Sequence, residues 1–320
     1  ELPMRLAVSP CPPVKAADFK VTIDTDKPPT DLTALFADVL RSPGGSHDSA
    51  SAMPNVIGLH YACGPDVAIL LSKNAGRYRI QSASFEALWL VARELVSRLR
   101  ASLPGVAVQF NEPLPLQEFF DLIDAHLAAR KAVAAVAADL EQRAAQFRAV
   151  QKRLLVRFKD KNPAPIANLD LIVTGTHAQL MDLADRMEAA QAEQASAAGA
   201  LSCATQLVCM LMALRFDLDE ENAEALRAHL SPLVSSDDDQ GWQERTDAAL
   251  THALRTSLGK SGKENAGGVG SNALAMPQDT SKLKKHITVL CDRLSNSKGG
   301  RFVNAGAGLQ PQTASQAQAQ

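Results

Sequence analysis

The chain has 320 residues, of which 46% are hydrophobic but only 4% aromatic, and its formal net charge is −2 at pH 7. This length leaves room for two or three domains with an apolar core. So few aromatic residues favour closely packed helices over a β-sandwich or a surface that stacks nucleic-acid bases. The near-neutral charge excludes a protein that is cationic over its whole surface.

The cysteines are odd in number, scattered along the chain and never spaced as CxxC: Cys11, Cys63, Cys203, Cys209 and Cys291. This usage indicates a reducing cytosolic setting rather than a disulfide framework. The sequence opens on Glu1 and shows no signal peptide, so we expect it to be a piece of a longer protein.

The first third of the chain mixes strand and helix patterns. Alternating apolar residues predict a strand at 19–24, and short β-rich runs between turn residues predict further strands at 56–62, 67–72, 77–81 and 106–110. A short helix is expected after Thr30, which is a plausible N-cap, and an amphipathic helix is expected at 84–101. The pattern predicts a small α+β domain, residues 18–125, with helices on one face of a sheet.

From Leu116 onward the pattern is helical. Apolar positions from Leu140 to Phe158 step by four and three residues, and after a break at Asn162–Pro165 the same alternation runs from Leu169 to Leu211. A period of 3.5 residues held for six heptads is typical of helices that wind around a partner helix.

Because proline ends the first helix and the link is short, we predict a long antiparallel, coiled-coil-like hairpin at residues 126–216. We call its apolar line the hairpin seam, with the members Leu140, Phe147, Leu154, Phe158, Leu169, Val173, Leu180, Leu183, Met187, Leu201, Val208 and Leu211.

The last third predicts a small C-terminal helical bundle, residues 217–300. Its helices are expected at 220–230, 241–258 and 280–294, the last capped by Asp279 or Thr280. Residues 259–275 are predicted to be a Gly/Ser linker, and residues 301–320 a disordered tail of low complexity. The apolar run Leu201–Phe216 is too short and too interrupted to span a bilayer, so we predict a buried helix there.

Several long runs resemble a known family. The runs FRAVQKRLLVRFKDKNPAP (147–165), GWQERTDAAL (241–250) and DTSKLKKHITVLCDRLS (279–295) are similar to the family of the ninth Bardet–Biedl syndrome protein, a BBSome subunit. The runs RYRIQSASFEALWL (77–90) and PLPLQEFFDLID (113–124) look like the platform domain of that family. The resemblance implies the C-terminal part of such a protein: platform, helical hairpin and C-terminal helices, with residues 1–17 ending a preceding appendage domain.

The same resemblance implies a function. It implies a non-catalytic scaffold subunit of a coat-like complex, the BBSome, which carries membrane proteins to and from cilia. The implied partners are the other BBSome subunits. The implied location is the cytoplasm, the cilium and the ciliary base, peripheral to the membrane within the complex, with roles in cilium biogenesis and intraflagellar transport.

A basic segment lies at the end of the first hairpin helix. Between Arg148 and Lys161 it holds six cations against one acid, Asp160. Three interpretations stay open: solvated flanks of the hairpin seam, docking onto an acidic surface of a partner subunit, or binding to anionic lipid or nucleic acid. The candidate partner-binding residues are Arg148, Lys152, Arg153, Arg157, Lys159 and Lys161, with Lys282, Lys284 and Lys285 from the last predicted helix.

The lipid interpretation makes the chain a peripheral membrane-binding module that uses these basic patches on anionic lipid. Nucleic acid is not expected, because aromatic residues are not interleaved with the cations. The acid-rich segment 217–239 has two interpretations, as solvated helix-start acids or as a counter-surface for a basic partner.

No motif of a nucleotide-binding loop, serine hydrolase, zinc protease or CxxC site occurs in the sequence. Cys203 and Cys209 are six residues apart on an apolar helix, so we expect both to be core residues on different faces. We therefore expect no enzyme activity, no catalytic residues, no cofactor, no metal site and no small-molecule substrate.

Overall fold

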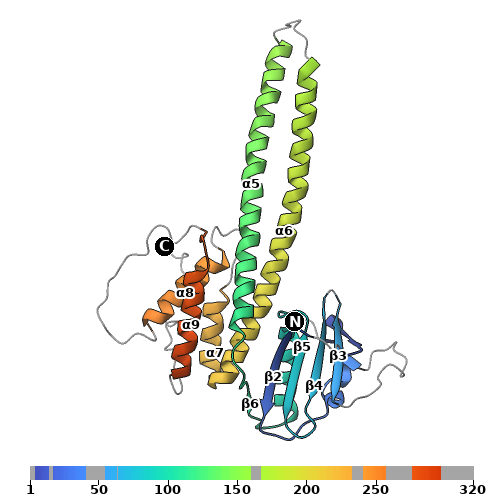
Figure 1. Ribbon diagram of the computed structural model, residues 1–320, viewed down its shortest axis with the longest axis vertical. Coiled ribbons are helices and arrows are strands. Elements are labelled where there is room, and N and C mark those ends of the chain that lie inside the picture. Colours follow the sequence, from blue (N-terminus) through green and yellow to red (C-terminus); the bar gives the residue numbers. More distant parts are fainter. Residues whose placement is uncertain are drawn as a thin grey trace, which may run out of the picture. The chain divides into compact units, whose positions relative to one another are not determined.

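The computed structural model describes residues 4–13, 17–40, 55–62, 64–159, 167–232, 241–256 and 276–296. The predicted linker 259–275, the tail 301–320 and the link Asn162–Pro165 lie outside these residues. The predicted fold class is confirmed: an antiparallel sheet with helices is followed by two long helices and a small helical bundle (Figure 1).

The first part of the chain is built on one sheet with the strand order β1-β3-β4-β5-β2-β6, in which all neighbours are antiparallel. Its strands are β1 (Val8–Cys11), β2 (Phe19–Thr25), β3 (Val56–Tyr61), β4 (Asp66–Leu71), β5 (Arg77–Ser82) and β6 (Val108–Gln109). The register places Val21, Ile80, Ile69 and Ile57 opposite one another across four strands. Because directly opposed side chains touch on a sheet face, this buried row forms the centre of the core face.

Strand β1 differs from the expectation for residues 1–17. Instead of ending a preceding appendage domain, Val8–Cys11 pairs with β3 and forms one edge of this sheet. Pro10 within it, with Pro12 and Pro13 directly after it, concealed it from strand prediction, because proline lacks a ladder donor and is tolerated only on an edge. The fit is close, since a Cβ added at Gly58 of β3 would come within 2.4 Å of the Cys11 carbonyl oxygen.

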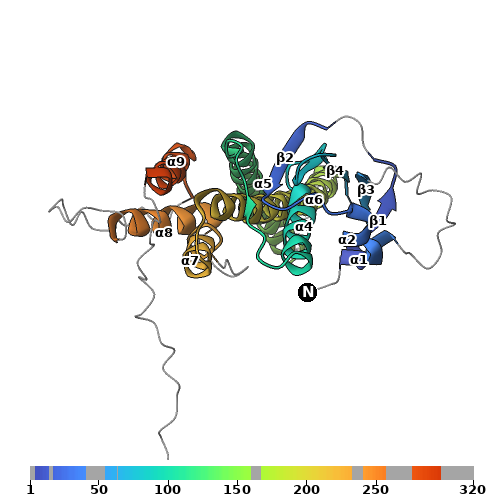
Figure 2. The same cartoon turned by 90° about the horizontal axis from the view of Figure 1, so that it is seen from below.

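Four helices accompany the sheet: α1 (Met4–Ala7), α2 (Leu32–Leu35), α3 (Ala37–Leu40) and α4 (Leu88–Ser102). Figure 2 shows α1, α2 and α4 along one side of the strands. Helix α4 turns its apolar positions inward, and Leu88, Val91, Leu95 and Leu99 are fully buried. The N-cap of α2 is Asp31 rather than Thr30. The Asp31 carboxylate accepts from the Thr33 backbone at 2.9 Å, whereas the Thr30 N–H donates to the Tyr78 hydroxyl.

Arg98 of α4 ties this helix to α2 and α3. Its guanidinium donates to the Leu35 carbonyl at 2.7 Å and makes two bonds with the Asp38 carboxylate, at 2.5 and 2.9 Å. It also lies over the Phe36 ring, 4.7 Å from the centroid. A two-pronged charged contact of this kind is stronger than a neutral hydrogen bond and fixes orientation.

Two long helices follow, α5 (Leu116–Lys159) of 44 residues and α6 (Ala167–Phe216) of 50 residues. At 1.5 Å per residue they are roughly 65 and 75 Å long. They run antiparallel and side by side (Figure 1), and residues Phe120–Leu201 form a compact unit of their own. The predicted boundary between residues 125 and 126 falls inside α5.

The bundle consists of α7 (Glu220–Leu230), α8 (Trp242–Thr256) and α9 (Ser281–Asn296), in which α8 packs against both α7 and α9. The C-terminal part of α6 joins it, and the Gln206 amide of α6 donates to the Ser231 hydroxyl at the end of α7 at 3.2 Å. Its core includes Leu207, Leu211, Leu226, Leu250 and Ile287, all fully buried. Asp219 caps α7 by accepting from the Asn222 N–H at 2.8 Å, and Asp279 accepts from the Ser281 N–H at 3.0 Å.

Replacement of Arg98 by Ala should lower the free energy of unfolding by about 2 kcal/mol, because it removes charged hydrogen bonds from a mostly buried side chain. Denaturant unfolding measures this, and Arg100→Ala, an exposed position on the same helix, is the control. The Arg98 guanidinium also lowers the pKa of Asp38 from its ordinary value of 3.8. The contribution of this pair should therefore persist above pH 4 and disappear as pH falls through the lowered pKa. Equal effects of both substitutions would contradict the assigned role.

Candidate functional site

The hairpin seam on α6 is the least exposed line of that helix. Every seam position from Val173 to Leu211 is half-buried or buried, and Leu183, Leu201 and Val208 are at most 6% exposed. Residues on the other faces of α6 between 171 and 200 are mostly exposed. Thr176, a polar residue in this line, donates its hydroxyl to the Ile172 carbonyl at 2.7 Å, so its polar group is satisfied within its own helix.

The seam on α5 is half-buried at Leu140, Phe147 and Leu154. The Phe147 ring meets the His177 ring of α6 with centroids 6.1 Å apart, a direct contact between the two helices. Phe158 differs from the prediction, because it is 80% exposed. The heptad spacing identifies the face of a helix, but it does not say how far along the helix the partner covers that face. The Leu169 side chain lies outside the described residues.

Exposed apolar side chains gather at what we call the distal end of the hairpin, residues 148–159 of α5 and 171–172 of α6. Leu155, Val156 and Phe158 of α5 are 65%, 51% and 80% exposed, and Leu171 and Ile172 of α6 are 73% and 46% exposed. Leu155 and Phe158 are three residues apart and so lie on one face of α5, whereas Val156 lies about 100° around the helix from Leu155. Exposed large apolar side chains that gather in one place normally mark a surface that another molecule covers.

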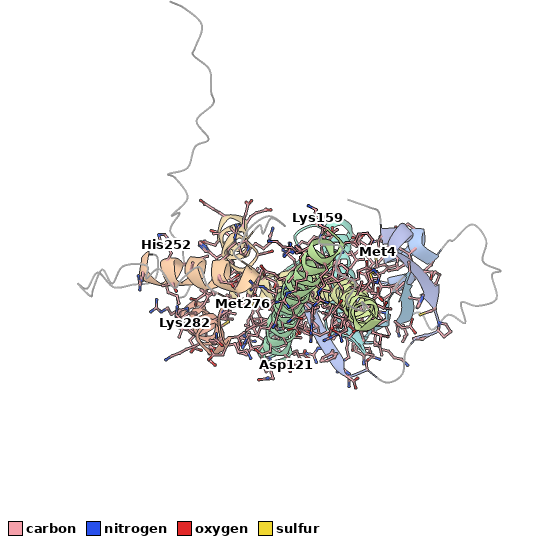
Figure 3. All side chains as sticks on the ribbon, turned by 90° about the horizontal axis from the view of Figure 1, so that it is seen from above. Met4, Asp121, Lys159, His252, Met276 and Lys282 are labelled. Carbon is pink, nitrogen blue, oxygen red and sulfur yellow. The ribbon has the colours of Figure 1, made fainter. Side chains whose placement is uncertain are left out.

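The distal end is also cationic. Arg148, Lys152, Arg153, Arg157 and Lys159 are all exposed, and none makes an ion pair with another described residue. No acid follows Glu141 in α5. Figure 3, which views the chain from above the hairpin, labels Lys159 on the last turn of this helix. The positive charge of the distal end is therefore not balanced by the part of the hairpin whose side chains are described. Lys161 lies outside the described residues.

The second predicted basic patch has a different environment. Lys282 bonds Asp247 of α8 at 2.6 Å, and His286 approaches the same carboxylate at 2.9 Å. Cations in the first turn of a helix oppose its macrodipole, and Asp247 offsets that cost here. Lys284 also has an interaction within the chain, and Lys285 is exposed. The ion pair of Lys282 with Asp247 thus links α9 to α8.

The sulfur and acidic groups have structural surroundings. Burial raises the pKa of the Cys209 and Cys291 thiols to about 12, and it also raises the pKa of the half-buried Cys203. Of the acid-rich segment, Asp219 serves as a helix cap. Within the described residues, no group of three or more His, Cys, Asp or Glu side chains could hold a metal ion.

One helix in the described part of the chain, Leu171–Phe216, is long and apolar enough to cross a membrane by length and composition alone. Half of its most apolar window is buried inside the protein. The core helix of a folded domain meets the same criterion, and Leu207, Val208, Leu211 and Met212 are fully buried. The burial fits the predicted core helix at Leu201–Phe216.

Comparison with known proteins finds matches along most of the chain. Three family models match: the PTHB1 platform domain at residues 3–118, the PTHB1 hairpin at 113–216 and the PTHB1 C-terminal helix bundle at 218–294. Over these three domains the chain belongs to the PTHB1 family. Protein PTHB1 of Homo sapiens is 43% identical over 317 residues, and that of Xenopus laevis is 43% identical over 315 residues. Protein PTHB1 of Mus musculus is 41% identical over 306 residues.

These alignments cover 98%, 97% and 94% of this chain, but only 35%, 36% and 34% of the relatives. The chain therefore spans about a third of the length of the curated relatives it matches. These matches correct the family name that the sequence resemblance implied. The resemblance implied the family of the ninth Bardet–Biedl syndrome protein. The matching family models and relatives instead carry the name PTHB1, for which BBS9 is an alias.

The buried thiols should be unreactive in the folded chain. In a variant that keeps only Cys209 and Cys291, a thiol reagent at pH 8 should react about a thousandfold more slowly than after unfolding, because little thiolate is present. The unfolded chain loses these protons near their ordinary pKa of 9.0, whereas the folded chain keeps them to about 12. The free energy of unfolding should therefore fall as pH rises from 9 to 12. Rapid labelling of the folded variant would contradict this.

Proposed function

We propose that this chain is the non-catalytic scaffold portion of a BBSome subunit and that it holds sister subunits through its hairpin. The observation that carries the proposal is the uncovered distal end of that hairpin, where Leu155, Phe158 and Leu171 are each at least 65% exposed. Large apolar side chains gathered on one surface mark an interaction site more often than a free surface. Membership of the PTHB1 family supports a role in a multi-subunit complex.

The balance of energies indicates how the hairpin would serve as a scaffold. Each fully buried Leu or Phe stabilises by roughly 1.5–3 kcal/mol, whereas an exposed ion pair contributes about 0.2–1 kcal/mol. The seam therefore holds α5 and α6 together without help from the surface charges. The outer faces, which are mostly exposed, stay available for other chains.

The finer part of the proposal rests on the family resemblance. We place the complex in the cytoplasm, at the ciliary base and in the cilium, where it transports membrane proteins. In this proposal the chain is peripheral to the membrane and acts through binding alone. Its hairpin, platform and bundle would each contact sister subunits of the same complex.

The double substitution Leu180→Asp with Leu183→Asp should abolish assembly with sister subunits. Two carboxylates in the seam would separate α5 from α6, at a cost of about 3 kcal/mol or more. Co-purification of the full-length protein with the co-expressed sister subunits measures the effect. The matched control is Ala189→Asp with Ala192→Asp, two exposed positions of α6 with the same spacing. Normal co-purification of the seam variant would refute the proposed function.

A further inference from the structure

We propose that the distal end of the hairpin seats in a groove of a partner protein whose floor is apolar and whose rim is acidic. This inference rests on the proposed scaffold function and specifies the surface and the chemistry of its partner. It concerns the outer surface of the distal end, which includes the exposed Phe158. The buried and half-buried positions of the seam lie between the two helices.

The first argument is the arrangement of apolar and cationic groups along α5. Residues three or four apart are neighbours on a helix surface. Leu155 therefore lies between Lys152 and Lys159, and Val156 lies beside Arg153. Each of these apolar side chains is bordered by a cation that has no ion-pair partner in the described part of the chain. A complementary surface must offer apolar area in the middle and negative charge around it.

The second argument is the identity of the cations. Arg148, Arg153 and Arg157 outnumber the lysines at 152 and 159. The planar guanidinium binds a carboxylate through two parallel hydrogen bonds, and arginine is enriched at protein interfaces, where lysine is depleted. A partner with Asp and Glu side chains at its rim fits this composition.

The third argument is the length of the cationic surface. From Arg148 to Lys159 it extends about 16 Å along the helix axis. A hairpin that entered a bilayer with its end would bring only its last turn to the headgroups, and screening limits charge attraction to about 8–10 Å in physiological salt. A protein groove that runs beside the helix contacts the whole length. The observations therefore favour an acidic protein surface over an anionic membrane.

Two variants of the full-length protein separate the charged part of the surface from the apolar part. Arg153→Glu with Arg157→Glu reverses the rim charge, and its control is Arg143→Glu with Arg186→Glu, two exposed arginines elsewhere on the hairpin. Leu155→Ser with Phe158→Ser removes apolar area, and its control is Met181→Ser, which is 50% exposed outside the distal end. All positions are on the helix surface, and circular dichroism verifies that each variant keeps its helix content.

The measurement is assembly with the co-expressed sister subunits. Each distal variant should weaken association about tenfold or more, whereas both controls should leave it unchanged. A photo-crosslinking amino acid at position 158 should then attach to an acidic segment of a sister subunit. Changing two acids of that segment to Lys should restore binding to the Arg153→Glu, Arg157→Glu variant.

Other outcomes would overturn the inference. Normal assembly of both distal variants would do so, and so would cross-links confined to a second copy of this chain. Flotation of the protein with vesicles of 30% phosphatidylserine, lost in the distal variants while assembly is retained, would assign the surface to lipid. If the seam variant fails to assemble but the distal variants assemble normally, the scaffold function stands and this inference falls. If the seam variant also assembles, the proposed function itself fails.

Discussion

The apolar contact between α5 and α6 is the interaction on which the rest of the chain's hairpin depends. Two helices of 44 and 50 residues cannot bury most of their surface against each other, and the contact is limited to one line of side chains. That line is sufficient to hold the two helices together, because the free energy gained on burial is roughly proportional to the apolar area buried and adds up over many residues. Its narrowness leaves the other faces of both helices to solvent or to other proteins.

The seam of α6 was predictable because a period of 3.5 residues survives in the sequence whatever surrounds the helix. The exposure of Phe158 was not predictable, because the periodicity identifies one face of α5 but does not show where along that face the packing against α6 ends. Strand β1 escaped prediction for another reason. Pro10 and the two prolines that follow the strand removed the pattern on which strand prediction depends, and the pairing with β3 identifies it.

The charged residues show the same division between local and distant information. The cap of α7 at Asp219 could be inferred from the neighbouring residues, since a cap is a contact within one turn. The pairing of Lys282 with Asp247 joins residues 35 positions apart and needs the packing of α8 against α9. Two basic clusters that looked equivalent in the sequence therefore differ. One is partly balanced inside the bundle, and the other is not balanced by the described residues.

Gly58 has a consequence for the outer border of the sheet. Even a methyl group there would collide with the backbone at Cys11 and Pro12, so β1 would have to move away from β3. Strand β3 would then become the terminal strand, with a row of free N–H and C=O groups that can recruit another chain. Because glycine has only a hydrogen atom as its side chain, β1 can stay paired with β3. The sheet then ends in a strand that contains a proline, and not in an open strand that could aggregate.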